Sequence, residues 1–209
     1  MTATAKANPI PNILTGARLF AGVVMFLILA GATGTPYVSA YLSPDDQFAL
    51  YRAAFYIYVV AASTDWIDGF LARRWKATTR WGAILDPIAD KVLITGAILG
   101  LLTSGSVTSI AIPCGLILFR EFAVSALRET TPGHVELPVT LLAKWKTTIQ
   151  LVALGAQQLI LLWDGFGLPL DYLPTFQGFA YVLLWIAALV TLWTGWQYFS
   201  KAQQKMSQI

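Results

Sequence analysis

Four aspartates stand close together between positions 65 and 90 of a chain that is otherwise poor in charge. Asp65 and Asp68 are three residues apart and Asp86 and Asp90 are four apart, whereas charged residues make up 12% of the 209 residues and hydrophobic residues 56%. Residues three or four apart share a face of an α-helix, so the spacing predicts two carboxylate pairs on two neighbouring helices. Carboxylates brought this close cannot all remain ionised unaided. Two divalent cations would neutralise them, and all-oxygen ligands favour hard ions such as Mg²⁺, so the segment predicts a metal site.

Small residues accompany these acids. Gly69, Ala72 and Gly82 flank the turn between the two pairs, where they would let a bulky ligand or another backbone approach closely. The alternative is that the aspartates are helix caps and loop charges paired with nearby basic side chains, namely Arg73, Arg74, Lys76 and Arg80. That alternative accounts for one or two of the acids and leaves the paired spacing unexplained.

The elements that must position these residues are membrane helices. A mean hydropathy of +0.62 is too high for an ordinary soluble domain. Six apolar stretches of about 20 residues, the length that a bilayer requires, are predicted as spans. They cover residues 13–32, 48–68, 82–103, 107–127, 139–162 and 177–199. We therefore expect an all-α integral membrane protein with six transmembrane helices, forming a single domain over residues 1–209, with polar helix tips that project into the headgroup region.

The basic residues predict the orientation. An even number of spans puts both termini on one side, and that side collects all of the 14 lysines and arginines except Arg52. Cytoplasmic loops carry the excess of positive charge, so we expect both termini and the four aspartates to face the cytoplasm from the inner membrane. The net charge of +3 suits anionic lipid headgroups, and no soluble basic domain is present that would bind nucleic acid. Cys114 is the one cysteine, which excludes a disulfide framework.

The spacing D65-x2-D68-G69-x2-A72-R73-x8-G82-x3-D86-x3-D90 resembles the signature of the CDP-alcohol phosphatidyltransferase family at every position. The resemblance implies a six-helix membrane enzyme, working as a homodimer, that moves a phosphatidyl or related group from a CDP-linked donor to an alcohol. Carried over by position, the four aspartates would hold two Mg²⁺ or Mn²⁺ ions, with Asp90 also the general base. Gly69, Arg73 and Thr79 would line the CDP diphosphate site, and Ala72 and Gly82 would also bind substrate.

Three further stretches, residues 8–18, 120–129 and 143–150, resemble bacterial phosphatidylglycerophosphate synthases. This resemblance implies CDP-diacylglycerol as donor and glycerol 3-phosphate as acceptor. A phosphorylated acceptor also fits four cations predicted near the turn between the fourth and fifth spans, although positive-inside topology alone would place cations there: Arg120, Arg128, Lys144 and Lys146. Lys144 and Lys146 lie on roughly opposite helix faces, so we expect one of them to touch substrate. Glu121 lies about 100° round the helix from Arg120 and is predicted not to neutralise it.

Near the N-terminus, Asn12, Thr15 and Arg18 recur at three-residue spacing and so share one face of the first helix. Thr15 and Arg18 are predicted to close over the nucleotide or headgroup; the alternative is a helix cap followed by an arginine that snorkels to the interface.

Two other functions remain open. The same chemistry could use inositol phosphate or phosphatidylglycerol as acceptor. The chain could instead be a carboxylate-lined cation transporter or a non-enzymatic cation-binding protein, although a transporter would place its acids near mid-membrane.

Overall fold

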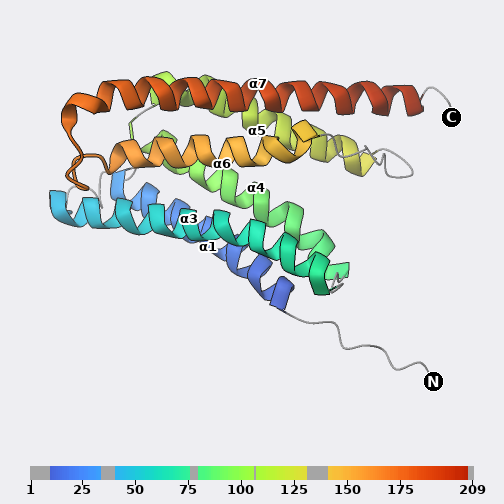
Figure 1. Cartoon of the computed structure of the whole chain (residues 1–209), viewed down its shortest axis with the longest axis horizontal. Helices are drawn as coiled ribbons and strands as arrows, with labels where there is room; N and C mark the ends of the chain where they lie inside the picture. Colours follow the sequence, from blue (N-terminus) through green and yellow to red (C-terminus); the bar gives the residue numbers. More distant parts are fainter. Residues whose placement is uncertain (1–9, 34–40, 76–79, 106, 131–140, 207–209) are drawn as a thin grey trace. The chain divides into compact units, whose positions relative to one another are not determined.

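A computed structural model describes residues 10–33, 41–75, 80–105, 107–130 and 141–206; within these ranges it leaves out the side chains of residues 10, 11, 65–75, 80, 81, 83, 107, 108, 129, 130, 141–144, 205 and 206. The described residues are almost entirely helical and contain no β-strand (Figure 1). The helices are α1 (Ile10–Thr33), α3 (Pro44–Trp75), α4 (Arg80–Thr103), α5 (Val107–Thr130), α6 (Leu141–Leu161) and α7 (Leu173–Met206), with a 3₁₀ turn at Leu170–Tyr172. Each predicted span falls on one of these helices, so the all-α prediction is confirmed.

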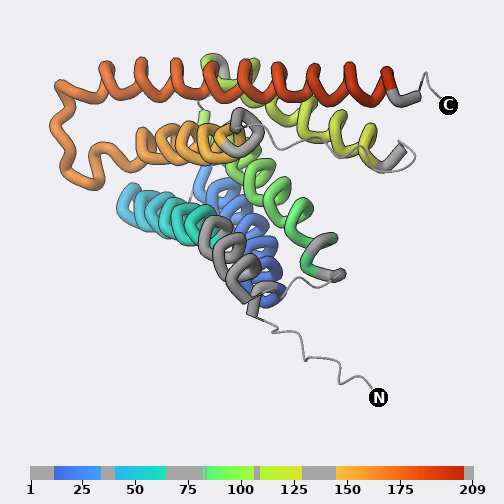
Figure 2. Tube along the Cα trace, turned by 45° about the vertical axis from the view of Figure 1, so that its right-hand side comes forward, coloured from blue at the N-terminus to red at the C-terminus, as the bar shows by residue number. Residues whose placement is uncertain are grey.

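The helices form two compact units, residues 1–104 and 105–209. In the first unit α1 packs along both α3 and α4, as the blue, cyan and green segments of Figure 2 show. Glycines bring α1 and α4 into backbone contact. A Cβ at Gly96 would lie 2.7 Å from the carbonyl oxygen of Gly22, and one at Gly22 would lie 3.0 Å from the Cα of Leu93. Small residues at a helix crossing allow such an approach in membrane proteins, so this glycine pair fixes where α1 crosses α4.

In the second unit α7 packs along both α5 and α6. Its core is built from small and aliphatic side chains of all three helices, among them Ile117, Leu154 and Leu184. The connection from α6 to α7 is a tight turn in which Gly167 adopts a φ of +63°, a conformation that favours glycine. The indole Nε1 of Trp163 donates a hydrogen bond of 3.1 Å to the carbonyl of Pro169 and closes this turn.

The outer surfaces of the helices carry large apolar side chains such as Phe20, Val60, Ile112 and Leu189, all exposed. Within the described residues, three helical stretches are long and apolar enough to cross a membrane: Asn12–Thr33, Ser109–Arg128 and Leu170–Gln204. Several helices run beyond the predicted spans; α3, for example, continues to Trp75. The helices are thus longer than the predicted spans, whereas the projection of their tips into the headgroup region and the side of the membrane on which the termini lie stay predictions.

Candidate active site

The aspartate pairs lie on two neighbouring helices of the first unit, as predicted. Asp65 and Asp68 belong to α3, Asp86 and Asp90 belong to α4, and the two helices contact each other and α1. Asp86 is exposed and Asp90 is half-buried, one helical turn and about 6 Å of axial rise further on. The structure describes only the helix positions, not the side chains, of five predicted site residues of α3, and Thr79 lies outside the described residues; the five are Asp65, Asp68, Gly69, Ala72 and Arg73. Gly82 is described, and it is buried in the first turn of α4.

Two side chains of α1 hold the α4 aspartates. The hydroxyl of Thr15 donates a hydrogen bond to Oδ1 of Asp86. The guanidinium of Arg18 lies 2.9 Å from Oδ1 of Asp90, and the Arg18 side chain is only 1% exposed. A snorkelling arginine would reach solvent, so that alternative is wrong for Arg18. Both side chains therefore face the aspartates, and each restricts the orientation of one carboxylate.

The Asp86 carboxylate fits a metal ligand. Its Oδ1 is taken by Thr15, while the described residues offer no hydrogen bond to its Oδ2, and the residue is exposed. A carboxylate oriented through one oxygen presents the other to an incoming cation, and such oxygens suit Mg²⁺ or Mn²⁺. Among the described side chains no group of three or more acidic, histidine or cysteine residues occurs. The predicted metal site also includes Asp65 and Asp68, whose side chains lie outside the described part of the chain.

A cavity of about 360 Å³ opens between α1 and α3 beside this site. Arg18 contributes to its wall, and most of the remaining lining is apolar, including Leu14, Tyr56 and Val60. The cavity thus has a mostly apolar wall next to a charged side chain. It suits an amphiphile whose apolar part lies in the groove and whose polar group faces the aspartates.

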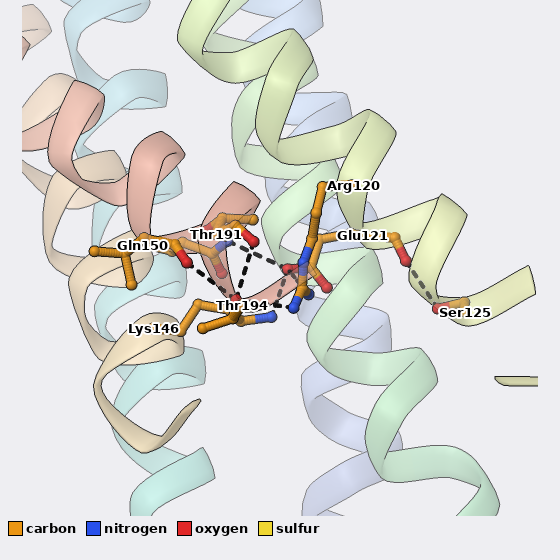
Figure 3. A network of polar contacts seen from close by, with 8 residues as sticks. Arg120, Glu121, Ser125, Lys146, Gln150, Thr191 and Thr194 are labelled. Atoms are coloured by element: carbon orange, nitrogen blue, oxygen red, sulfur yellow. Dashed lines mark hydrogen bonds and ion pairs between the residues drawn. The ribbon is translucent and has the colours of Figure 1, made fainter. Parts of the chain in front are cut away.

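The second unit contains a separate polar cluster, shown in Figure 3. Oε1 of Glu121 accepts hydrogen bonds from Arg120 NH1 at 3.2 Å and from Lys146 Nζ at 2.5 Å. Gln150 Nε2 donates to the same oxygen at 3.3 Å and to Thr191 Oγ1 at 2.6 Å. Two cations and one carboxylate leave the cluster with one net positive charge. Because its side chains are largely buried, this charge is poorly screened by solvent.

The prediction that Glu121 would not neutralise Arg120 is wrong. Although the two Cα positions differ by about 100° around α5, both side chains are long enough to turn toward each other and form an ion pair. The second amino group of Arg120 donates to Thr194 Oγ1 at 2.9 Å. Gly195 makes room for this arrangement, since a Cβ there would lie 2.8 Å from Cγ of Arg120.

The other predicted acceptor residues are placed differently. Lys146 joins the cluster, whereas the side chain of Lys144 lies outside the described residues. Arg128 is exposed in the last turn of α5, two helical turns beyond Arg120. Four members of the cluster were not predicted from the sequence: Glu121, Gln150, Thr191 and Thr194. Gln150 follows Lys146 by four residues and Thr194 follows Thr191 by three, so same-face spacing was the available signal.

Comparison with known proteins identifies the family of the chain. The family model described as CDP-alcohol phosphatidyltransferase matches residues 8–193. The chain belongs to this family. Proteins named CDP-diacylglycerol--glycerol-3-phosphate 3-phosphatidyltransferase are similar to it over most of its length. The protein from Cereibacter sphaeroides is 37% identical, over 92% of this chain and 95% of its own. That from Rickettsia bellii is 38% identical, over 93% of this chain and 96% of its own.

A third relative with the same name, from Haemophilus influenzae, is 41% identical over 70% of this chain and 75% of its own. The family match spans the aspartate signature and all of the Arg120 cluster except Thr194. Membership makes the chain a membrane phosphotransferase, and it gives the two aspartates held by α1 a chemical context.

Proposed function

We propose that this protein transfers the phosphatidyl group of CDP-diacylglycerol to glycerol 3-phosphate, which yields phosphatidylglycerophosphate and releases CMP. The observation that carries the proposal is the complete aspartate signature in a chain whose relatives, matched over more than nine-tenths of their length, are named for this reaction. Arg120 and Lys146 add a reason from the chain's own chemistry. A net positive cluster suits a phosphorylated acceptor better than a neutral alcohol.

In this proposal Asp65, Asp68, Asp86 and Asp90 hold two divalent metal ions, Mg²⁺ or Mn²⁺. Such ions neutralise the charge of a diphosphate as its bond to the phosphatidyl phosphorus breaks. Thr15 keeps Asp86 turned so that its second oxygen remains available. The CDP diphosphate is bound near Gly69, Ala72, Arg73, Thr79 and Gly82, and the apolar groove beside Arg18 accommodates part of the donor lipid.

Asp90 is proposed as the general base that takes the proton of the acceptor hydroxyl. Its carboxylate is half-buried at the helix turn next to Asp86, and Arg18 holds one of its two oxygens. An oriented carboxylate near the reacting hydroxyl is well placed to accept a proton as the new phosphoester bond forms. Arg18 acts through Asp90 in this scheme and is a positioning residue.

The acceptor phosphate is proposed to bind at Arg120 and Lys146, with Arg128 and Lys144 as further basic residues of the acceptor site. In the structure Lys146 and one amino group of Arg120 both donate hydrogen bonds to Glu121. The carboxylate therefore holds both cations in place for the binding of an anion. The cytoplasmic face of the inner membrane is the proposed location of both the aspartates and this cluster, since it is where the basic residues gather. A homodimer is proposed from the family resemblance.

The deciding experiment measures CMP release by the purified protein in mixed micelles with CDP-diacylglycerol and one candidate acceptor at a time. Glycerol 3-phosphate should support release, whereas inositol phosphate, phosphatidylglycerol and glycerol should support little. Asp171→Asn serves as the matched control for Asp86→Asn, because Asp171 lies in the 3₁₀ turn before α7. CMP release with another acceptor alone would show that this acceptor, and not glycerol 3-phosphate, is the substrate. No CMP release with any acceptor would support a non-enzymatic cation-binding protein.

A further inference from the structure

A second cavity lies in the residue 105–209 unit, at the end of the bundle where α5 begins, α6 ends and α7 begins. Its volume is about 390 Å³, which lies within the range of small-molecule sites. Figure 1 shows the α6–α7 connection at this end. Ser109 in its wall precedes Arg120 by eleven residues of α5, about 16 Å along the axis, so the cavity is separate from the Arg120 cluster. The proposed transfer reaction makes no use of it.

The polar groups in the wall are uncharged. They are the carboxamides of Gln157 and Gln177, the hydroxyl of Ser109 and the phenol of Tyr181. Gln157 is the most informative of them, because it is only 6% exposed and its amide has no hydrogen-bond partner among the described residues. Its amide atoms are not among the fully buried unpaired atoms of the described residues, so they remain accessible for hydrogen bonds with a ligand in the cavity.

The charges around the cavity exclude an anionic ligand. Residues 104–119 and 150–199 contain no lysine or arginine, while Asp164 and Asp171 lie in the nearby turn. Each polar group in the wall both donates and accepts hydrogen bonds, and a ligand hydroxyl does the same. The rest of the wall includes Ile110, Ile160 and the Tyr181 ring, apolar surfaces that suit C–H groups.

We propose that this cavity binds an uncharged polyhydroxylated group, that is, a sugar or polyol. The group could be a free sugar or the sugar headgroup of a membrane lipid, since the wall recognises the hydroxyls in either case. The proposal does not depend on the transferase activity.

Gly178 makes the proposal testable without disturbing the fold. It lines the cavity, and a Cβ built on it meets no atom within 4 Å. Gly178→Leu therefore fills the cavity and also raises helix propensity. Gln157→Leu keeps the approximate size of the side chain and removes the amide that would form hydrogen bonds with the ligand. Gly31→Leu is the matched control, because its Cβ also meets open space in a helix of the other unit.

The experiment is saturation-transfer difference NMR on the full chain in a detergent without a sugar headgroup, such as lauryldimethylamine oxide. The probes are maltose, methyl glucoside, octyl glucoside and inorganic phosphate, and the Tm in detergent is measured on each variant as a check of folding. The sugars should bind to the wild type and to Gly31→Leu. Affinity should fall by on the order of tenfold in Gln157→Leu and more in Gly178→Leu, with the Tm of each variant close to that of the wild type.

The outcomes separate the sources of the ligand. Binding of methyl glucoside and maltose supports a free sugar, whereas binding of octyl glucoside alone, lost in both variants, supports a lipid headgroup. The proposal is overturned if no sugar binds to the wild type or if both variants bind the sugars as the wild type does. It is also overturned if phosphate binds to the wild type and the two variants abolish the phosphate signal.

Discussion

Replacing Arg120 with alanine tests whether the cluster of the second unit binds the acceptor phosphate. With Arg120 present, two cations and the Glu121 carboxylate leave one positive charge, whereas without it Lys146 and Glu121 neutralise each other. The variant should remain folded, because Glu121 keeps Lys146 and Gln150 as partners and Thr194 still bonds to the carbonyl of Val190. The change therefore removes net charge from the proposed site and leaves no buried carboxylate unpaired.

The loss of one charged hydrogen bond corresponds to about 1.5–3 kcal/mol. At 1.4 kcal/mol per factor of ten, the apparent KM for glycerol 3-phosphate should rise roughly 10- to 150-fold. Arg120→Lys keeps the charge and loses the planar fork, so its KM should lie between those of the wild type and the alanine variant. The KM for CDP-diacylglycerol should change by less than about twofold, since no donor contact is removed.

The assay is a pair of saturation curves for each variant, one for each substrate, followed by CMP release. Arg52→Ala is the control, because Arg52 lies on α3 with its guanidinium 5.8 Å from the centre of the Phe48 ring and outside the cluster. A rise in the KM of the lipid donor alone would assign Arg120 to the donor site. Unchanged KM values for both substrates would refute the role of the cluster in binding phosphate.

Other predictions concern the first unit. Excess chelator should abolish CMP release and Mg²⁺ or Mn²⁺ should restore it, while Asp86→Asn should lower turnover by several powers of ten; full activity in chelator would contradict the two-metal site. Asp90→Asn should lose roughly 10²–10⁴ in turnover yet keep its affinity for CDP-diacylglycerol in a direct binding assay, and near-normal turnover would exclude a base at this position. Arg18→Gln should lower kcat by a larger factor than it changes either KM, and Arg18→Lys should recover part of kcat. An equal loss of kcat in the two variants would indicate a purely structural arginine. Gly96→Val should lower the free energy of unfolding by about 1–3 kcal/mol, seen as a lower Tm in detergent, because its side chain would collide with the backbone of Gly22.

The elements and the aspartate signature could be predicted because both depend on local spacing. Hydrophobic runs of bilayer length located the six α-helices of the described residues, and intervals of three and four residues placed the members of each aspartate pair on the same helix. The ends of the helices were less well predicted: α3 continues seven residues past the expected span because polar residues can extend a membrane helix into the headgroup layer.

The contacts of α1 could not be predicted in this way. Thr15 bonds to a residue 71 positions later and Arg18 to one 72 positions later, and no local pattern encodes such pairs. Side-chain reach caused the error at Glu121: the helical angle between neighbouring positions was right, but two long side chains can span it. The roles of individual acceptor residues therefore depend on packing between helices, which spacing along one helix does not reveal.

The ion pair between Arg18 and Asp90 also constrains the order in which the protein can be assembled. During synthesis α1 emerges first, and its arginine enters an apolar segment long before α4 has been made. An arginine within a membrane segment is costly to insert, by about 2.5–3.5 kcal/mol at the centre of a helix on the scale set by the insertion machinery. Asp90 can offset that penalty only once α4 has joined the bundle. Pairing of Arg18 with Asp90 is thus a late event in biogenesis, and a chain truncated before α4 would leave Arg18 without the Asp90 carboxylate.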